Sequence, residues 1–189
     1  MAEQADMSGD VTPEQFFEQL LPAGFEAQKA DGIGVPENFT MQYEISGDGG
    51  GSWHVTIEGG QMSTEKGTKE ANMLIRISRV DWYDAVLSQN GADISLLLPQ
   101  GRPGRPDSSP RAKLLKGTMA LELSRDGDPF QMEVSFGGAD TPRTVMKAKI
   151  EDYVAIGQGK LNGQEAFMTG RVRVEGDMAF MMQIAALTG

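Results

Sequence analysis

The chain has 189 residues with a formal net charge of −10, and 39% of its residues are apolar while 23% are charged, which excludes disorder along its whole length. It has no cysteine, so disulfides, thiolate nucleophiles and cysteine-based metal sites are excluded. The excess of acidic residues disfavours binding to nucleic acid, because affinity for a duplex depends on Lys and Arg side chains that neutralise phosphates.

The N-terminal segment is predicted to be a flexible acidic tail, residues 1–10, followed by a helix. The tail lacks the pattern of a secretory signal and no apolar run reaches bilayer-spanning length, so we expect a cytoplasmic protein. Thr12 is a suitable N-cap and Pro13 a suitable first helical residue. Pro22 and Gly24 are expected to kink or end this helix. Its apolar stripe consists of Phe16, Phe17, Leu20, Leu21 and Phe25.

The residues that follow predict a hairpin, a further strand and a helix. Apolar residues alternate over 39–45 and again over 53–57, with a glycine-rich turn at 46–52 between them. His54 is expected on the solvated face of its strand, opposite to Trp53. A strand over 73–78 leads into a short helix over 80–87.

Residues 99–110 contain four prolines and predict an irregular loop that divides the chain. Basic residues cluster in and after this loop. They are either a solvated basic loop or a patch that touches an anionic membrane surface. The residues of this predicted patch are Arg102, Arg105, Arg111, Lys113 and Lys116.

The second half repeats the order of elements in the first. Strands over 119–124 and 130–138 flank a turn at 125–129, and a strand over 145–150 leads into a helix that opens at Glu151. The two helices are expected to end on Asn90-Gly91 and Asn162-Gly163 as left-handed C-caps. This series predicts an internal β-β-β-α repeat with a spacing of about seventy residues.

A stretch near the C-terminus carries a family resemblance. Residues 159–178 read GKLNGQEAFMTGRVRVEGDM, and the GKL, AFMTG and GD elements before an apolar helix resemble the sterol-carrier-protein-2 (SCP2) sterol-binding family. The resemblance covers about Met119 to Leu187, and the first half resembles the family's β1–β2–β3–α2 part again. It implies an α+β fold in which a layer of five mostly antiparallel strands, with helices on one face, encloses an apolar tunnel closed by the C-terminal helix.

The predicted fold class is therefore an α+β, SCP2-like layer of mostly antiparallel strands covered by helices on one face and enlarged by the internal repeat. We expect a single domain over 11–189, with a first half at 11–98, the Pro/Arg-rich loop at 99–112 and a second half at 113–189. The resemblance implies binding of sterols, fatty acids, acyl-CoAs or phospholipids without a cofactor. The apolar tunnel is assigned to the second half.

The residues independently suit such a site. The C-terminal helix is almost wholly apolar, and 12 methionines supply unbranched side chains that adapt to varied ligand shapes. An ordinary buried core is the alternative explanation. Thr169 and Gly170 are assigned to strand entry and turn, and Asp177 to a turn or an N-cap. The candidate ligand-binding residues are Trp82, Tyr153, Ile156, Phe167, Met168, Met178, Met181, Met182 and Ala185.

Catalytic chemistry is not expected. His54 is the single histidine, which excludes histidine metal clusters, and Asp126-Gly127-Asp128 lacks the spacing of a calcium loop. The sequence predicts a non-catalytic lipid-binding or lipid-transfer protein that uses neither metal nor cofactor and holds a sterol, fatty acyl chain or phospholipid. The alternatives are an interaction or scaffold module with a filled core that serves a partner enzyme, and an accessory domain of a lipid-processing enzyme.

Overall fold

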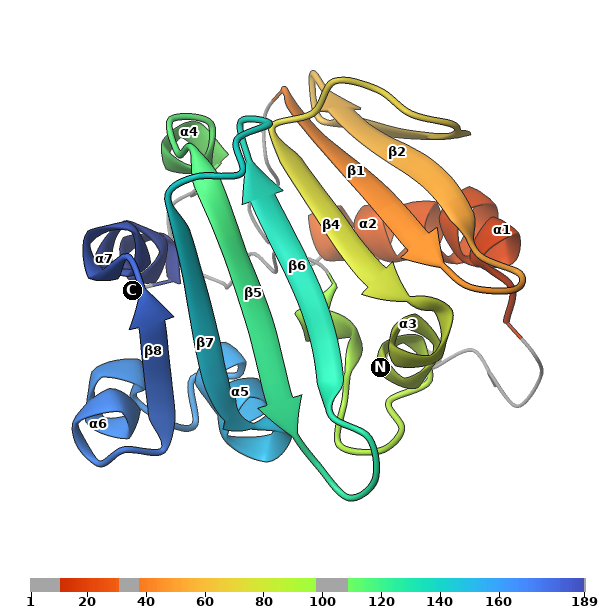
Figure 1. Ribbon diagram of the computed structural model, residues 1–189. Helices are drawn as coiled ribbons and strands as arrows, with labels where there is room; N and C mark the ends of the chain where they lie inside the picture. Colours follow the sequence, from red (N-terminus) through yellow and green to blue (C-terminus); the bar gives the residue numbers. More distant parts are fainter. Residues whose placement is uncertain (1–10, 31–37, 98–108, 189) are drawn as a thin grey trace.

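Alternating apolar residues build one continuous sheet across both halves of the chain. The computed structural model describes residues 11–30, 38–97 and 109–188 (Figure 1). Within these ranges eight strands pair in the order β3-β2-β1-β4-β6-β5-β7-β8. The helices cover one face of the sheet and leave the other open, which confirms the predicted α+β class. The predicted tail and most of the Pro/Arg-rich loop lie outside the described residues.

The first half contributes four strands. β1 (Phe39–Ser46) and β2 (Gly51–Glu58) form the predicted antiparallel hairpin. β1 also pairs in parallel with β4 (Met73–Ser78), the predicted third strand. β3 (Gln61–Lys66) adds to the edge beside β2 and was not predicted, because its polar sequence QMSTEK has no apolar alternation.

The second half pairs its strands in the same senses. β5 (Gly117–Ser124) is antiparallel to β6 (Phe130–Phe136) and parallel to β7 (Arg143–Lys149). β8 (Val172–Gly176) closes the sheet beside β7. The order β6-β5-β7 thus matches β2-β1-β4, and antiparallel pairing of β4 with β6 joins the two halves. The internal repeat itself stays a prediction.

The N-terminal helical segment comprises α1 (Pro13–Gln15), η1 (Phe16–Leu20) and α2 (Leu21–Ala30). The Thr12 side chain accepts a hydrogen bond from the backbone N–H of Gln15, so the predicted N-cap is confirmed. The prediction that Pro22 kinks or ends the helix is wrong in its second part, since α2 runs on to Ala30. The wider π-helical turn of η1 precedes the proline, and such a turn accommodates a residue without an N–H.

The other helices are α3 (Arg79–Val86), η2 (Ile94–Leu96), α4 (Ser109–Ala112), α5 (Ile150–Gly157), α6 (Gly163–Met168) and α7 (Met178–Thr188). Three of them, α3, α5 and α7, directly follow a strand, and the remaining three are short. The predicted C-caps are wrong. α3 ends at Val86, with Asn90 and Gly91 in the turn beyond it, and Asn162 begins α6, where its side chain accepts from the N–H of Glu165.

A buried ion-pair cluster fastens the two halves together. Arg125, in the β5–β6 turn, donates hydrogen bonds of 2.8 Å to Asp81 and 2.8 Å to Asp84 on α3. The three side chains are at most 9% exposed. Ser78 and Asn90 donate to the remaining carboxylate oxygens. Because each buried charge is paired, the arrangement holds the turn of the second half against the helix of the first.

His54 is buried, so its predicted solvated position is wrong. Only 8% of the residue is exposed, and its Nε2 lies 3.5 Å from a carboxylate oxygen of Glu65. The connection from β3 to β4 crosses this face of the sheet. There the Lys69 N–H donates to Gln42 and its ammonium group donates to Thr56.

Candidate functional site

Three helices of the second half carry eight of the nine predicted ligand-binding residues. α5 follows β7 and α6 leads into β8, so both lie where β7 ends and β8 begins, whereas α7 follows β8 and lies at the other end of that strand (Figure 1). We call the residues they contribute the C-terminal apolar surface. These residues are Tyr153, Ile156, Phe167, Met168, Met178, Met181, Met182 and Ala185.

The connection between α6 and β8 sets where Phe167 and Met168 lie. The Thr169 hydroxyl donates to the Glu165 carbonyl, so Thr169 closes the helix instead of entering the strand as expected. Gly170 adopts φ 74°, a left-handed conformation that ends the helix and supports the predicted turn. Phe167 and Met168 therefore occupy the last turn of a short helix, where their side chains reach solvent.

α7 is anchored at its start and through one stripe. The Asp177 side chain accepts a hydrogen bond of 2.7 Å from the N–H of Phe180, which confirms the predicted N-cap. Phe180 and Ile184 are buried, and the Phe180 ring packs edge-on against Phe136. Gly117 permits this packing, since a Cβ there would lie 2.9 Å from the Phe180 ring. Met181 and Leu187 are partly buried against the core, and Met178 and Met182 are exposed.

The C-terminal apolar surface is unusually exposed. Phe167, Met168, Met178 and Met182 are 45%, 78%, 44% and 66% exposed. They are four of the six large apolar side chains found exposed among the described residues. Tyr153, Ile156 and Met181 are half-buried against the core beneath them. Exposed apolar side chains of this size mark interaction sites in soluble proteins where they gather into a patch. That these residues line an enclosed tunnel stays a prediction.

Tyr153 shows how the surface grades into the core. Its ring is half-buried, and desolvation raises the pKa of its hydroxyl to about 12. A neutral, poorly hydrated hydroxyl can donate a hydrogen bond to a polar group of a bound molecule. Ile156, on the same helix, lies beside the start of α6, where a Cβ at Gly163 would sit 3.6 Å from its side chain.

Trp82, the ninth predicted residue, lies elsewhere. It is fully buried on α3 in the first half. Its ring contacts are with Phe16, 5.5 Å away and edge-on, and with the guanidinium of Arg79, 4.7 Å from the ring centre. The structure therefore places Trp82 in the aromatic core of the first half, and any contact with a ligand stays a prediction.

Part of the predicted basic patch adjoins α7. Arg111, on α4, donates a hydrogen bond of 3.3 Å to the carbonyl of Ala186 near the end of α7. Leu114, which sequence reasoning did not single out, is 82% exposed in the connection that also carries Lys113 and Lys116. The other two predicted patch residues, Arg102 and Arg105, lie outside the described residues. No helix within 11–30, 38–97 and 109–188 is both long and apolar enough to cross a bilayer.

Comparisons with known proteins support a family assignment for the second half. The model of the SCP-2 sterol transfer family matches residues 96–189. A search of curated proteins found no match.

Three similar solved structures carry sterol carrier names. The sterol carrier protein domain 2 of Helicoverpa armigera is 24% identical at a TM-score of 0.32, over 39% of this chain and 66% of that one. The sterol carrier protein 2 like 2 of Aedes aegypti is 17% identical at a TM-score of 0.37, and the match covers 57% of this chain and 96% of that one. The apo form of sterol carrier protein 2 from Yarrowia lipolytica is 13% identical at a TM-score of 0.22, and the match covers 93% of this chain and 81% of that one.

Proposed function

Because the C-terminal half of the chain, residues 96–189, belongs to the SCP-2 sterol transfer family, we propose that the protein binds a lipid on the C-terminal apolar surface and carries it without chemical change. The ligand class is a sterol, a fatty acyl chain or a phospholipid.

The observation that carries the proposal is the exposure of large apolar side chains on α6 and α7, in contrast to the N-terminal helical segment, whose phenylalanines are buried. Met182 is 66% exposed although α7 has charged residues nowhere along its length. A solvated helix of this composition is unfavourable, whereas covering it with hydrocarbon contributes about 0.8 kcal/mol per buried CH₂ group. A lipid therefore supplies the cover that the described protein segments do not.

The residue types fit a ligand of variable shape. Met168, Met178, Met181 and Met182 have unbranched thioether side chains that change rotamer at small cost. Tyr153 adds one neutral hydroxyl in apolar surroundings. A site with many adaptable apolar groups and few polar groups binds lipids with modest selectivity and needs no cofactor or metal.

The basic residues at the end of α7 suggest how lipid reaches the surface. Arg111 and its neighbours Lys113 and Lys116 place positive charge beside exposed Leu114 and the apolar α7. Basic side chains near an exposed apolar residue favour transient contact with an anionic bilayer. We propose this edge as the side from which lipid is exchanged.

Native mass spectrometry of delipidated protein tests the binding site. We expect adducts with oleic acid, cholesterol or phosphatidylcholine, and we expect Met178→Gln with Met182→Gln to weaken binding at least about tenfold by placing amides among hydrocarbon. Val80→Gln is the matched control, since Val80 is 68% exposed on α3 in the first half. Absence of binding to all three lipids would favour an interaction module that presents the same surface to a protein.

A further inference from the structure

A separate groove lies on the open face of the sheet, at the end where β5 and β7 finish and β8 begins. Its volume is about 630 Å³. It is lined by Glu122, Ser124, Pro129, Gln131, Lys147, Ala148, Lys149, Asp152, Gly170, Arg171 and Arg173. Most of its lining residues are charged or polar, and the residues assigned to lipid binding are not among them.

The sheet register gathers its basic residues. Lys147 and Lys149 are two residues apart on β7, so they share one face. Arg171 directly precedes β8, and Arg173 is its second residue. Lys147 lies directly opposite Arg173 in the β7–β8 ladder. Like charges in opposite positions destabilise a sheet unless something neutralises them.

The acidic residues in and beside the groove neutralise only part of this charge. Lys147 pairs with Glu122 at 3.4 Å and with Glu175 at 3.0 Å, and Arg171 pairs with Asp152 at 3.0 Å.

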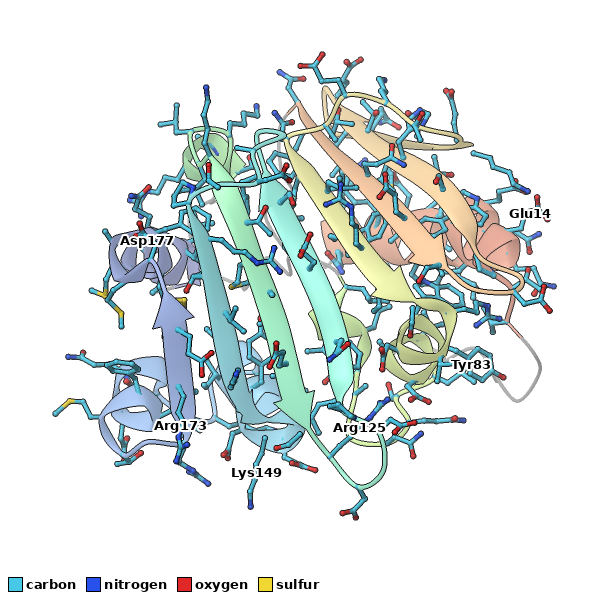
Figure 2. The ribbon with its side chains drawn as sticks, in the orientation of Figure 1. Glu14, Tyr83, Arg125, Lys149, Arg173 and Asp177 are labelled. Atoms are coloured by element: carbon cyan, nitrogen blue, oxygen red, sulfur yellow. The ribbon has the colours of Figure 1, made fainter. Side chains whose placement is uncertain are left out.

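Lys149 and Arg173 have no ion-pair partner in the part of the chain that the structure describes. Figure 2 shows their side chains at the same end of the sheet, on the neighbouring strands β7 and β8. Two cations without an ion-pair partner, in diagonal positions on neighbouring strands, are notable in a chain with a net charge of −10.

We propose that this groove binds a phosphate ester. The two positive charges left unpaired match a phosphate monoester, which carries a charge of about −1.5 to −2 at pH 7. The guanidinium of Arg173 is a planar fork that binds two phosphate oxygens at once, and Lys149 adds a compact positive charge. Gln131 lines the same groove, and its side-chain amide supplies a neutral hydrogen-bond donor.

Two sources of the phosphate ester suit this position. A soluble phosphate ester fits within the groove. A phospholipid headgroup would also reach it, because Gly170 and Arg171 lie within three residues of the exposed Met168 of α6. The chemistry recognised is the same in both cases, and it does not depend on whether the C-terminal apolar surface binds lipid.

Calorimetric titration with glycerol 3-phosphate at low ionic strength tests the soluble source, and flotation with phosphatidylcholine vesicles, with and without phosphatidic acid, tests the headgroup. We expect Lys149→Gln with Arg173→Gln to weaken binding at least about tenfold, since two charge-assisted contacts are lost. The control is Lys29→Gln with Lys66→Gln, which removes the same charge from the first half and should leave binding within about twofold of the wild type.

The outcomes separate the possibilities. Loss of glycerol 3-phosphate binding in the groove variant alone supports a soluble ligand, and loss confined to phosphatidic acid vesicles supports a headgroup. Equal weakening in the groove and control variants would show a general charge effect and overturn the proposal. So would a wild-type protein that binds neither probe. Lipid adducts in native mass spectra are a separate readout, so failure here leaves the proposed lipid site untouched.

Discussion

The two halves of the molecule pair their strands in the same senses, but their helices bury different shares of their apolar side chains against the sheet. In the first half Phe16, Phe17, Leu21 and Phe25 from the N-terminal segment are each at most 6% exposed. In the second half α5 and α6 bury one residue each, Ile150 and Ala166, and α7 buries a single stripe. Similar sheets therefore support one filled core and one open apolar surface.

The difference lies in what covers each sheet. Phe17 stacks on Trp53 at 5.3 Å and packs against Tyr43 at 5.0 Å, so the N-terminal helix fills the space above β1 and β2. Before β5, the described part of the chain supplies the short helices η2, which packs against α5, and α4, and neither carries an aromatic residue. A lipid bound beside α5, α6 and α7 would occupy the role that Phe16 and Phe17 play in the first half.

The strongest test of how the halves depend on each other is Arg125→Met. The variant leaves Asp81 and Asp84 buried without their cation, and we expect it to lower the free energy of unfolding by about 4–5 kcal/mol. Urea unfolding followed by tryptophan fluorescence measures this change. Arg76→Met is the control, because Arg76 is 43% exposed in its pairs with Glu44 and Glu133 and should cost less than about 1 kcal/mol. Similar losses in both variants would contradict the role of Arg125.

The filled core of the first half predicts a large cost for removing one ring. Phe17→Ala deletes a fully buried side chain, and we expect a loss of about 3–4 kcal/mol in unfolding free energy. Met182→Ala in the second half should change it by less than about 0.5 kcal/mol, because that side chain is largely exposed. If the methionine variant were equally destabilised, α7 would be covered in solution and the contrast between the halves would disappear.

Ligand binding should make the second half more like the first, because a bound lipid covers its open apolar surface. At an oleic acid concentration about one hundredfold above the dissociation constant, linkage predicts an increase of about 2.7 kcal/mol in unfolding free energy. Hydrogen exchange should show added protection in α5, α6 and α7 and little change in α1 to α3, which are already closed. Protection spread evenly over both halves would indicate binding elsewhere.

Much of the fold followed from residue patterns, and the failures have identifiable causes. Alternation and turn chemistry predicted the β1–β2 hairpin and the strands of the second half. The edge strand β3 escaped because its stability comes from pairing with β2, not from an apolar pattern of its own. The burial of His54 depends on a connection that folds over the sheet, which local sequence cannot reveal.

The sequence predicted which apolar residues make up the candidate site, but not that several of them are exposed to solvent. The apolar α7 indicated a buried helix, yet Met178 and Met182 reach solvent because the described segments place nothing over them. The Arg125 cluster joins residues 41 and 44 positions apart and carries no local signal. The groove did carry a local sequence signal. The segments Lys147-Ala148-Lys149 and Arg171-Val172-Arg173 alternate basic residues, which puts like charges on one face of the sheet.

The smallest expected effect concerns Tyr153, at the boundary between core and open surface. Desolvation raises its pKa from the ordinary value of 10.0 to about 12, so in the folded protein it keeps its proton where the unfolded chain begins to lose it. The stability that this tyrosine contributes is therefore fully present below about pH 10 and is lost as the pH rises toward about 12. Tyr153→Phe should flatten the fall in unfolding free energy over this interval.

Alkaline absorbance titration measures the same ionisation directly, and Tyr153→Phe identifies the step that belongs to Tyr153. Burial raises the pKa of Tyr43 further, and its hydroxyl donates to the Leu97 carbonyl at 3.1 Å, so the two tyrosines titrate separately. A step for Tyr153 near pH 10 would mean that water reaches its hydroxyl and that the open surface extends deeper than the half-buried ring indicates. Bound lipid should move the step to still higher pH, because hydrocarbon replaces the remaining water and further disfavours the charged phenolate.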